Sequence, residues 1–209
     1  MRERIRKFMT RQFSRPSGFF GKFIGNRMAK GNVYDARWTV SLLDIQPNDR
    51  ILEIGFGPGV STQLASGKAS KGFVAGIDHS KTMVQAASKR NASAMQAGLM
   101  ELKHGDVSSL PYPDESFDTA FSLHSIYFWP NPVDCLKELR RVLKPGGLLG
   151  ITIQPKDKWE PNVDPNVMTL YFGSDVASLF SEAGYRNIHV EVPPPQEDKI
   201  SLECILGVK

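Results

Sequence analysis

Apolar and polar positions follow a regular pattern along the chain after residue 49. Short apolar runs, typical of buried strands, alternate with longer segments in which apolar residues recur at helical spacing. The expected strands are 50–54, 73–77, 99–104, 117–123 and 148–153, and the expected helices are 61–67 with Ser61 as its N-cap, 81–98, 133–143 and 174–183. This alternation predicts a parallel sheet with helices on both faces.

The end of the chain departs from this alternation. Two further expected strands, 187–192 and 200–207, are separated only by a short segment that begins with three prolines. Because this segment is too short for a helical crossover, we expect the two strands to pair antiparallel. The predicted fold class is therefore α/β, with a Rossmann-like, doubly wound, seven-stranded sheet that is mostly parallel with an antiparallel last strand. Residues 154–173 are expected to be an insertion with one helical turn.

Length and composition are those of an ordinary globular domain. The chain has 209 residues, of which 41% are hydrophobic, and its longest apolar runs are far too short to cross a bilayer. The basic N-terminus does not lead into the apolar stretch of a secretory signal. Cys135 and Cys204 lie far apart and outside any metal-ligand pattern, so we expect a reduced, cytoplasmic location and no bound metal.

Lys and Arg are concentrated at the N-terminus. Residues 1–37 contain ten of them against only Glu3 and Asp35, which gives this segment a charge of +8, whereas residues 38–209 carry −4. We therefore divide the chain into a basic N-terminal helical arm or lid, 1–37, and a single domain, 38–209. The domain itself has no nucleic-acid-binding signature, which disfavours a nucleic acid as partner.

Within the arm, apolar residues are spaced as on one face of a short amphipathic helix. They are Ile5, Phe8, Met9 and Phe13, with basic residues between them. Three interpretations are open: a helix folded back on the domain with its charges solvated, an interfacial helix in peripheral contact with a membrane, and an arm that contacts RNA phosphates. The sequence does not separate the last two.

The residues that end the strands are the candidates for a binding site, because ligands of open α/β sheets lie beyond the carboxyl ends of the strands. The first strand ends at Glu53 and Ile54 and runs into a turn with glycines at 55, 57 and 59, which permit a tight turn and close ligand approach. A dinucleotide loop is disfavoured, because Val60 stands where its third glycine is needed, Pro58 lacks an N–H and Glu53 repels phosphate. We expect a cationic, phosphate-free ligand.

The next two strands end in aspartates. Asp78 ends the second strand, 19 residues after Gly59, where its carboxylate can accept hydrogen bonds from both hydroxyls of a ribose. Asp106 ends the third strand, where it can accept a hydrogen bond from an exocyclic amine such as that of adenine. Aspartate is also common as a cap, but acids at three successive strand ends favour a binding site.

Together these residues resemble the class I S-adenosylmethionine-dependent methyltransferases. The resemblance rests on five segments in this order: 51–59, 76–80 with Met83, 104–106, 110–118 and 139–148. It extends over residues 34–207 and is nearest to the group that contains the C-methyltransferases of quinone biosynthesis and many small-molecule enzymes. It implies in-line transfer of a methyl group from the sulfonium of S-adenosylmethionine to a nucleophile, with S-adenosylhomocysteine as product and no metal.

The resemblance also implies which residues bind S-adenosylmethionine. They are Glu53, Gly55, Phe56, Gly57 and Gly59 for the methionine part, Asp78 for the ribose hydroxyls, His79 against the adenine ring, Asp106 with the Val107 backbone for the adenine amino group, and Ser122 near the ribose and the reactive methyl.

The segment after the fourth strand supplies the candidates for the acceptor side. His124 lies where a base could reach an acceptor hydroxyl, and it is the candidate catalytic residue, although a hydrogen-bonded structural histidine fits the sequence equally well. Tyr34, Tyr127 and Trp129 are candidates for binding the substrate, and packing in the core is the alternative for the last two.

The leading hypothesis is a methyltransferase that acts on a small, apolar or aromatic metabolite. The alternatives are a non-catalytic cofactor-binding module, and an RNA or protein methyltransferase that uses the basic arm. A monomer and a homodimer are both compatible with the sequence.

Overall fold

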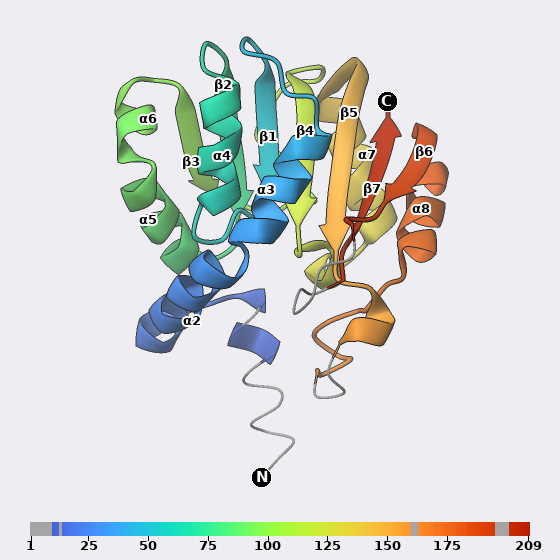
Figure 1. Cartoon of the computed structure of the whole chain (residues 1–209), viewed down its shortest axis with the longest axis horizontal. Helices are drawn as coiled ribbons and strands as arrows, with labels where there is room; N and C mark the ends of the chain where they lie inside the picture. Colours follow the sequence, from blue (N-terminus) through green and yellow to red (C-terminus); the bar gives the residue numbers. More distant parts are fainter. Residues whose placement is uncertain (1–9, 13, 160–162, 195–200) are drawn as a thin grey trace.

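A computed structural model describes residues 10–12, 14–159, 163–194 and 201–209. Seven strands form one sheet in the order β3-β2-β1-β4-β5-β7-β6 (Figure 1). Strand β7 pairs antiparallel with both of its neighbours, and the other pairs are parallel, so the predicted fold class is confirmed. The strands are β1 Arg50–Ile54, β2 Phe73–Asp78, β3 Met100–His104, β4 Phe117–Leu123, β5 Leu143–Ile153, β6 Arg186–Glu191 and β7 Glu203–Val208.

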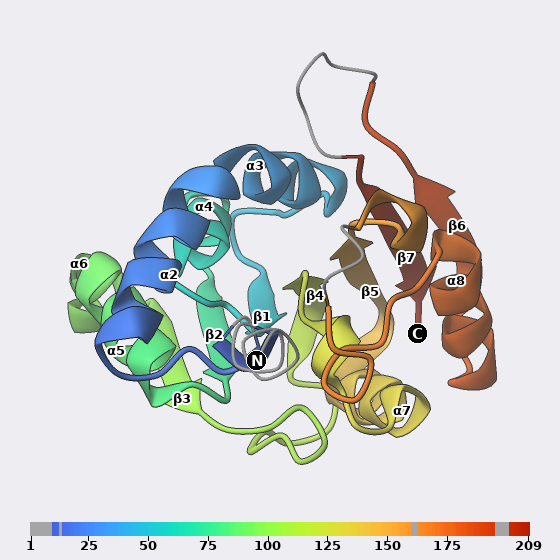
Figure 2. The same cartoon turned by 90° about the horizontal axis from the view of Figure 1, so that it is seen from below.

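Helices cover both faces of this sheet, as the view along the strands shows (Figure 2). Helices α3, α4 and α5 pack on one face, and α7 and α8 pack on the other. The helices are α2 Gly18–Gly31, α3 Val33–Leu42, α4 Val60–Lys68, α5 Lys81–Arg90, α6 Ala92–Gln96, α7 Pro132–Val142 and α8 Gly173–Glu182, with 3-10 turns η1 Ile126–Phe128 and η2 Lys156–Lys158.

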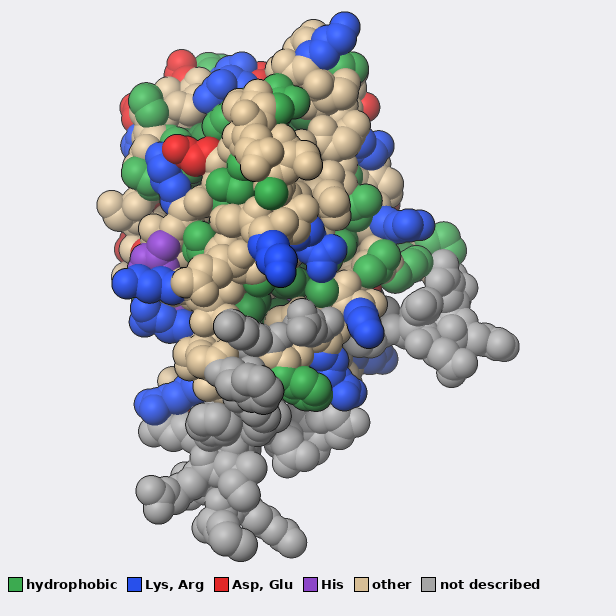
Figure 3. Space-filling model, turned by 90° about the vertical axis from the view of Figure 1, so that its left-hand side faces the viewer, with side chains coloured by type: hydrophobic (Ala, Val, Ile, Leu, Met, Phe, Trp, Pro, Cys, Tyr) green, Lys and Arg blue, Asp and Glu red, His purple; other side chains and the backbone are tan. Residues whose placement is uncertain are grey.

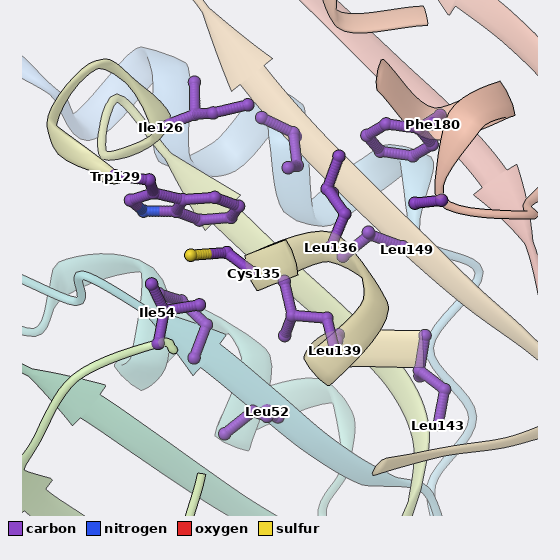
Figure 4. Close-up of a cluster of buried hydrophobic side chains, with 14 of the residues drawn as sticks. Leu52, Ile54, Ile126, Trp129, Cys135, Leu136, Leu139, Leu143, Leu149 and Phe180 are labelled. Atoms are coloured by element: carbon purple, nitrogen blue, oxygen red, sulfur yellow. The ribbon is translucent and has the colours of Figure 1, made fainter. Parts of the chain in front are cut away.

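Successive strand residues pack on opposite faces, which explains the near-continuous apolar runs in the sequence. On β1, Ile51 belongs to the cluster under α3, α4 and α5, whereas Leu52 belongs to the cluster under α7 and α8. Figure 4 shows the second cluster, where Leu136 and Leu139 of α7 and Phe180 of α8 lie around the sheet. These three side chains are fully buried, so α7 and α8 cover the central strands on this face of the sheet.

The single helix predicted over 81–98 was wrong, because the chain breaks at Asn91 into α5 and α6. The Asn91 side-chain amide donates to the carbonyl of Ala87, 3.0 Å away, and to that of Gly59, 3.1 Å away. Asparagine competes for backbone hydrogen bonds in this way and therefore ends the helix. The same contact attaches the end of α5 to the glycine-rich loop.

Ser61 is also not the N-cap that the sequence suggested. Gly59 takes that place, in the left-handed conformation with φ +76°, and the Ser61 hydroxyl donates to Glu53 instead.

The predicted fifth strand is longer than expected, because β5 begins at Leu143 and pairs with Phe117 before a register shift. The turn with Gly146 at φ +78° forms this irregularity.

The N-terminal segment is partly described. The residues predicted to form the amphipathic face, Ile5, Phe8, Met9 and Phe13, lie outside the described residues. The division predicted between residues 37 and 38 falls inside α3, whose buried residues lie on both sides of it.

Helix α2 packs on α5. Lys and Arg side chains are spread over the face formed around these two helices, with apolar side chains between them (Figure 3). Within the described part of the chain, no helix combines the length and apolar character needed to cross a membrane.

Gly72, just before β2, provides a test of the sheet geometry. A Cβ at this position would lie 2.0 Å from the backbone carbonyl oxygen of Asp49, which cannot move without breaking its hydrogen bond to Phe73. We expect Gly72→Ala to lower the free energy of unfolding by about 1 to 3 kcal/mol, measured by chemical denaturation. The matched control is Gly67→Ala in α4, where a Cβ meets nothing within 4 Å. That variant should be neutral or slightly stabilised, since alanine favours helix.

Candidate functional site

A pocket lies at the carboxyl ends of β1, β2, β3 and β4, the end of the sheet that faces the reader in Figure 2. The loops after these strands form most of its wall, and Pro16, Met28 and Ala36 close it from the N-terminal side. The predicted site residues that line it are Glu53, Gly55, Phe56, Gly57, Asp78, His79, Asp106, Val107, His124 and Trp129. The structure therefore brings residues from four strand ends together.

The glycine-rich loop depends on two different properties of glycine. Gly55 has φ +71°, and a Cβ there would lie 2.5 Å from the Cβ of Ser125, so no larger residue fits. Gly57 has φ +52°, but a Cβ there would meet nothing within 4 Å, so the space above it stays open for a ligand. Gly59 caps α4 and does not line the pocket.

Asp78 holds the loop in place from the end of β2. One carboxylate oxygen accepts a hydrogen bond from the Gly57 N–H at 2.9 Å, and the other accepts one from the Ser80 N–H at 2.7 Å. Burial raises the pKa of Asp78 in spite of these hydrogen bonds. Since each carboxylate oxygen can accept two hydrogen bonds, both can still accept one from a ligand.

Glu53 is the most buried acid of the site, with 0% exposure. The Ser61 hydroxyl donates to its Oε1, while its Oε2 has no hydrogen-bond partner among the described residues. Burial raises the pKa of Glu53 to about 7, although the hydrogen bond from Ser61 and the nearby Thr62 hydroxyl oppose the rise. A carboxylate in this state gains most from a positively charged partner, because such a partner favours its ionised form.

The end of β3 has a different character. Burial opposes ionisation of Asp106, but two hydrogen bonds from Ser108, at 2.7 and 2.9 Å, outweigh it and hold the pKa of Asp106 below its usual range. Burial lowers the pKa of His79 and thus favours the neutral ring. The pocket wall therefore contains an ionised carboxylate, Asp106, and a neutral imidazole, His79. Val107 lines the same pocket.

Two of the aromatic residues predicted to contact a substrate lie away from the pocket wall. Tyr127 is 2% exposed, and its hydroxyl donates to the Gln154 carbonyl at 3.1 Å and accepts from the Gln154 N–H at 2.5 Å. Tyr34 is half-buried on α3 and does not line the pocket. Trp129 does line it, and its indole N–H donates to Ser125 at 3.2 Å.

Ser122 is buried beneath the pocket, where its hydroxyl lies 2.6 Å from that of Ser125. Ser125 also donates to the Ile54 carbonyl at 3.3 Å and so connects the ends of β1 and β4. Sequence reasoning missed Ser125, whose role becomes visible only when the two strands are placed side by side.

Other residues that sequence reasoning missed come from the N-terminal segment. The Pro16 carbonyl accepts a hydrogen bond of 2.6 Å from the Ser80 hydroxyl, which holds this segment over the end of β2. Asp35 of α3 contacts His124, with 2.9 Å between Oδ2 and Nε2. No motif marks either contact, because each joins residues more than 60 positions apart. Among the described residues, no group of three or more His, Cys, Asp or Glu side chains could hold a metal ion.

The fold is that of an open α/β protein, and its candidate site is a set of carboxylates at the carboxyl ends of neighbouring strands. Residues 52–151 match the family described as "Methyltransferase domain". The chain is 31% identical over 167 residues to the uncharacterized methyltransferase YdaC of Bacillus subtilis (strain 168), covering 80% of this chain and 88% of YdaC. The chain belongs to the class I S-adenosylmethionine-dependent methyltransferases.

Two further similarities agree with this family. The chain is 34% identical over 113 residues to the demethylmenaquinone methyltransferase of Bacillus cereus (strain B4264), covering 52% of this chain and 46% of that enzyme. This match spans less than half of the length of the demethylmenaquinone methyltransferase. A solved SAM-dependent methyltransferase from Aquifex aeolicus has a TM-score of 0.70 and 21% identity over 96% of both chains, which shows the shared fold.

The buried Glu53 carboxyl predicts an unusual pH dependence of stability. Because its pKa is higher in the folded than in the unfolded chain, the folded protein retains a proton that the unfolded chain releases. Stability should therefore fall as pH rises from about 4.5 to about 7. Glu53→Gln removes this loss and should raise the free energy of unfolding at pH 8 by roughly 1 to 3 kcal/mol. Chemical denaturation of the parent and the variant at pH 5 and pH 8 checks this. If the free energy of unfolding falls between pH 5 and pH 8 by the same amount in both proteins, the prediction is contradicted.

Tyr127→Phe separates a packing role from a ligand-binding role. The variant leaves the ring contacts in place but removes both hydrogen bonds to Gln154. We expect a loss of about 1 to 3 kcal/mol in the free energy of unfolding, because the Gln154 N–H loses its acceptor, whereas the Gln154 carbonyl keeps the indole N–H of Trp159 as a donor at 3.0 Å. Affinity for S-adenosylmethionine, measured by calorimetry on the folded variant, should stay within twofold of the parent. A large loss of affinity at unchanged stability would instead assign Tyr127 to the site.

Proposed function

We propose that the protein transfers a methyl group from S-adenosylmethionine to a small, apolar or aromatic metabolite. The observation that carries this proposal is the composition of the pocket wall. Strands β1 and β2 contribute the buried carboxylates of Glu53 and Asp78, whereas the segment after β4 contributes the apolar side chains of Phe128, Trp129 and Pro130. One pocket thus offers a cation-binding part and an apolar part.

The carboxylates fit S-adenosylmethionine. The Oε2 of Glu53, buried without a partner in the described structure, suits the positive charge of the methionine part. Asp78 can accept two more hydrogen bonds, which is the number that the ribose hydroxyls donate. A neutral His79 suits contact with the uncharged adenine ring, and an ionised Asp106 suits its amino group. When bound, this ligand supplies an activated methyl group on its sulfonium.

The remaining task of the protein is to bind the acceptor, orient it and exclude water. Met28, Leu123, Phe128 and Trp129 give the acceptor part of the wall an apolar surface. Among the described lining residues outside the proposed S-adenosylmethionine site, His124 is the only titratable side chain. We assign it as the base, which is needed where the acceptor keeps its proton until attack.

The comparison with the demethylmenaquinone methyltransferase supports an apolar ring compound as acceptor, within the half of the chain that the similarity covers. The cytoplasmic location, the choice between monomer and homodimer and the peripheral membrane contact of the arm stay predictions. A non-catalytic binding module and an RNA or protein methyltransferase are the alternatives against which the proposal is tested.

Calorimetric titration with S-adenosylmethionine tests the cofactor assignment. Asp78→Ala should weaken binding about 10- to 100-fold, because two ligand hydroxyls lose their acceptor and the Gly57 N–H loses the carboxylate that holds the loop. The matched control is Asp157→Ala, which removes a half-exposed aspartate of η2 and should leave affinity unchanged. Equal affinity of Asp78→Ala and the parent would contradict the assignment.

Formation of S-adenosylhomocysteine tests the catalytic part. The parent protein should form it with a member of a panel of aromatic and quinol metabolites. Binding of S-adenosylmethionine without product would favour the non-catalytic module. Product formed only with RNA or protein would favour the other alternative.

A further inference from the structure

His124 is held in a conformation that a histidine rarely adopts. Its φ of +56° lies in the left-handed region, which is unfavourable for residues other than glycine by about 1 to 2 kcal/mol. Its backbone N–H donates to the Thr152 carbonyl at 3.0 Å, so the adjacent strand β5 fixes this conformation. Backbone strain of this kind persists where the surrounding structure enforces it, and it is concentrated at functional sites. The conformation places the ring on the pocket wall.

Asp35 contacts this ring from α3. Its Oδ2 lies 2.9 Å from His124 Nε2, and the side chains of the histidine and the aspartate are 18% and 9% exposed. One helical turn further along, the Thr39 hydroxyl lies 2.8 Å from the Thr152 hydroxyl in the interior. Helix α3 therefore contacts the β4–β5 part of the sheet at two separate points, through Asp35 and through Thr39.

This contact determines which ring nitrogen carries the proton. A carboxylate oxygen only accepts hydrogen bonds, so the nitrogen that faces Asp35 must be the donor, and the neutral imidazole is protonated at Nε2. The lone pair then lies on Nδ1. That atom has no partner among the described residues and is covered in the unliganded structure, so a hydroxyl in the pocket reaches it only by displacing the side chains that cover it. A buried nitrogen without a partner is unfavourable, and a hydroxyl that donates to it removes the penalty.

We propose that Asp35 is a positioning residue that holds His124 as the Nε2-protonated tautomer, and that the acceptor is a hydroxyl compound whose proton passes to Nδ1. This inference rests on the proposed function. In the reaction, an oxygen electron pair forms the bond to the methyl carbon, and the carbon–sulfur bond breaks with its electrons moving to sulfur. The hydroxyl proton moves to His124, so one positive charge passes from the sulfonium to an imidazolium that Asp35 stabilises.

The tautomer is measured first, because it does not depend on a known acceptor. In protein labelled with ¹⁵N-histidine, the His124 signals, assigned by their loss in His124→Gln, should show a protonated Nε2 and an unprotonated Nδ1. Asp35→Ala should produce a mixture of both tautomers. A protonated Nδ1 in the parent protein would overturn the proposal, whether or not any acceptor is methylated.

Measurements of kcat and KM then show whether Asp35 positions His124 for the reaction or only stabilises the fold. Matched pairs of hydroxyl and amine compounds, such as 2-naphthol and 2-naphthylamine within a wider panel, serve as acceptors, and S-adenosylhomocysteine is measured. For the hydroxyl members, Asp35→Asn should lower kcat about 10²- to 10⁴-fold, with little change in KM or in the affinity for S-adenosylmethionine. In a His124→Gln background the same substitution should have little further effect, since it acts through the ring.

Thr39→Val is the matched control, because it breaks the other attachment of α3 without touching His124. It should lower stability while kcat stays close to that of the parent. Equal losses of kcat in Thr39→Val and Asp35→Asn would overturn the positioning role, and so would methylation of amine members alone. If the tautomer is as expected but S-adenosylmethionine does not bind, the proposed function fails and the Asp35–His124 arrangement stands.

Discussion

The hydrogen bond from the Gly57 N–H to Asp78 is the contact on which the site depends, because it joins the turn after β1 to the carboxylate that ends β2. Parallel pairing of the two strands brings these residues to one edge, and the buried carboxylate then holds the turn in a shape that leaves room above Gly57. Asn91 holds the far side of the same loop through the Gly59 carbonyl. The cleft is thus shaped by polar contacts to backbone, within a framework of apolar packing.

The sequence predicted the sheet well because each central strand is covered on both faces, which leaves an uninterrupted apolar run. It also predicted the acids at three strand ends, since topology alone brings them to one edge. It failed where a single side chain overrides a pattern. Asn91 ends a helix whose apolar spacing continues beyond it, and Ser61 satisfies Glu53 instead of capping its helix.

Contacts between distant segments were beyond sequence reasoning for a different reason. From the sequence, Asp35 contributes only a charge to a basic arm, and nothing in its neighbourhood indicates a histidine 89 positions away. Tyr127 looks like a candidate for the acceptor wall because it follows β4, yet the 3-10 turn η1 directs its hydroxyl to Gln154. Side chains that follow a strand can face the ligand or the core, and local geometry decides between these outcomes.

The unpartnered oxygen of Glu53 also affects the stability and the degradation of the protein when no ligand is bound. Burying this carboxylate without a charged partner is unfavourable. A positively charged ligand that pairs with it in the folded state only stabilises that state by mass action. Proteases attack the transiently opened chain, so degradation should slow as the surrounding ligand concentration rises. If the proposed methyl donor is that occupant, the abundance of the protein in a cell follows the supply of the donor.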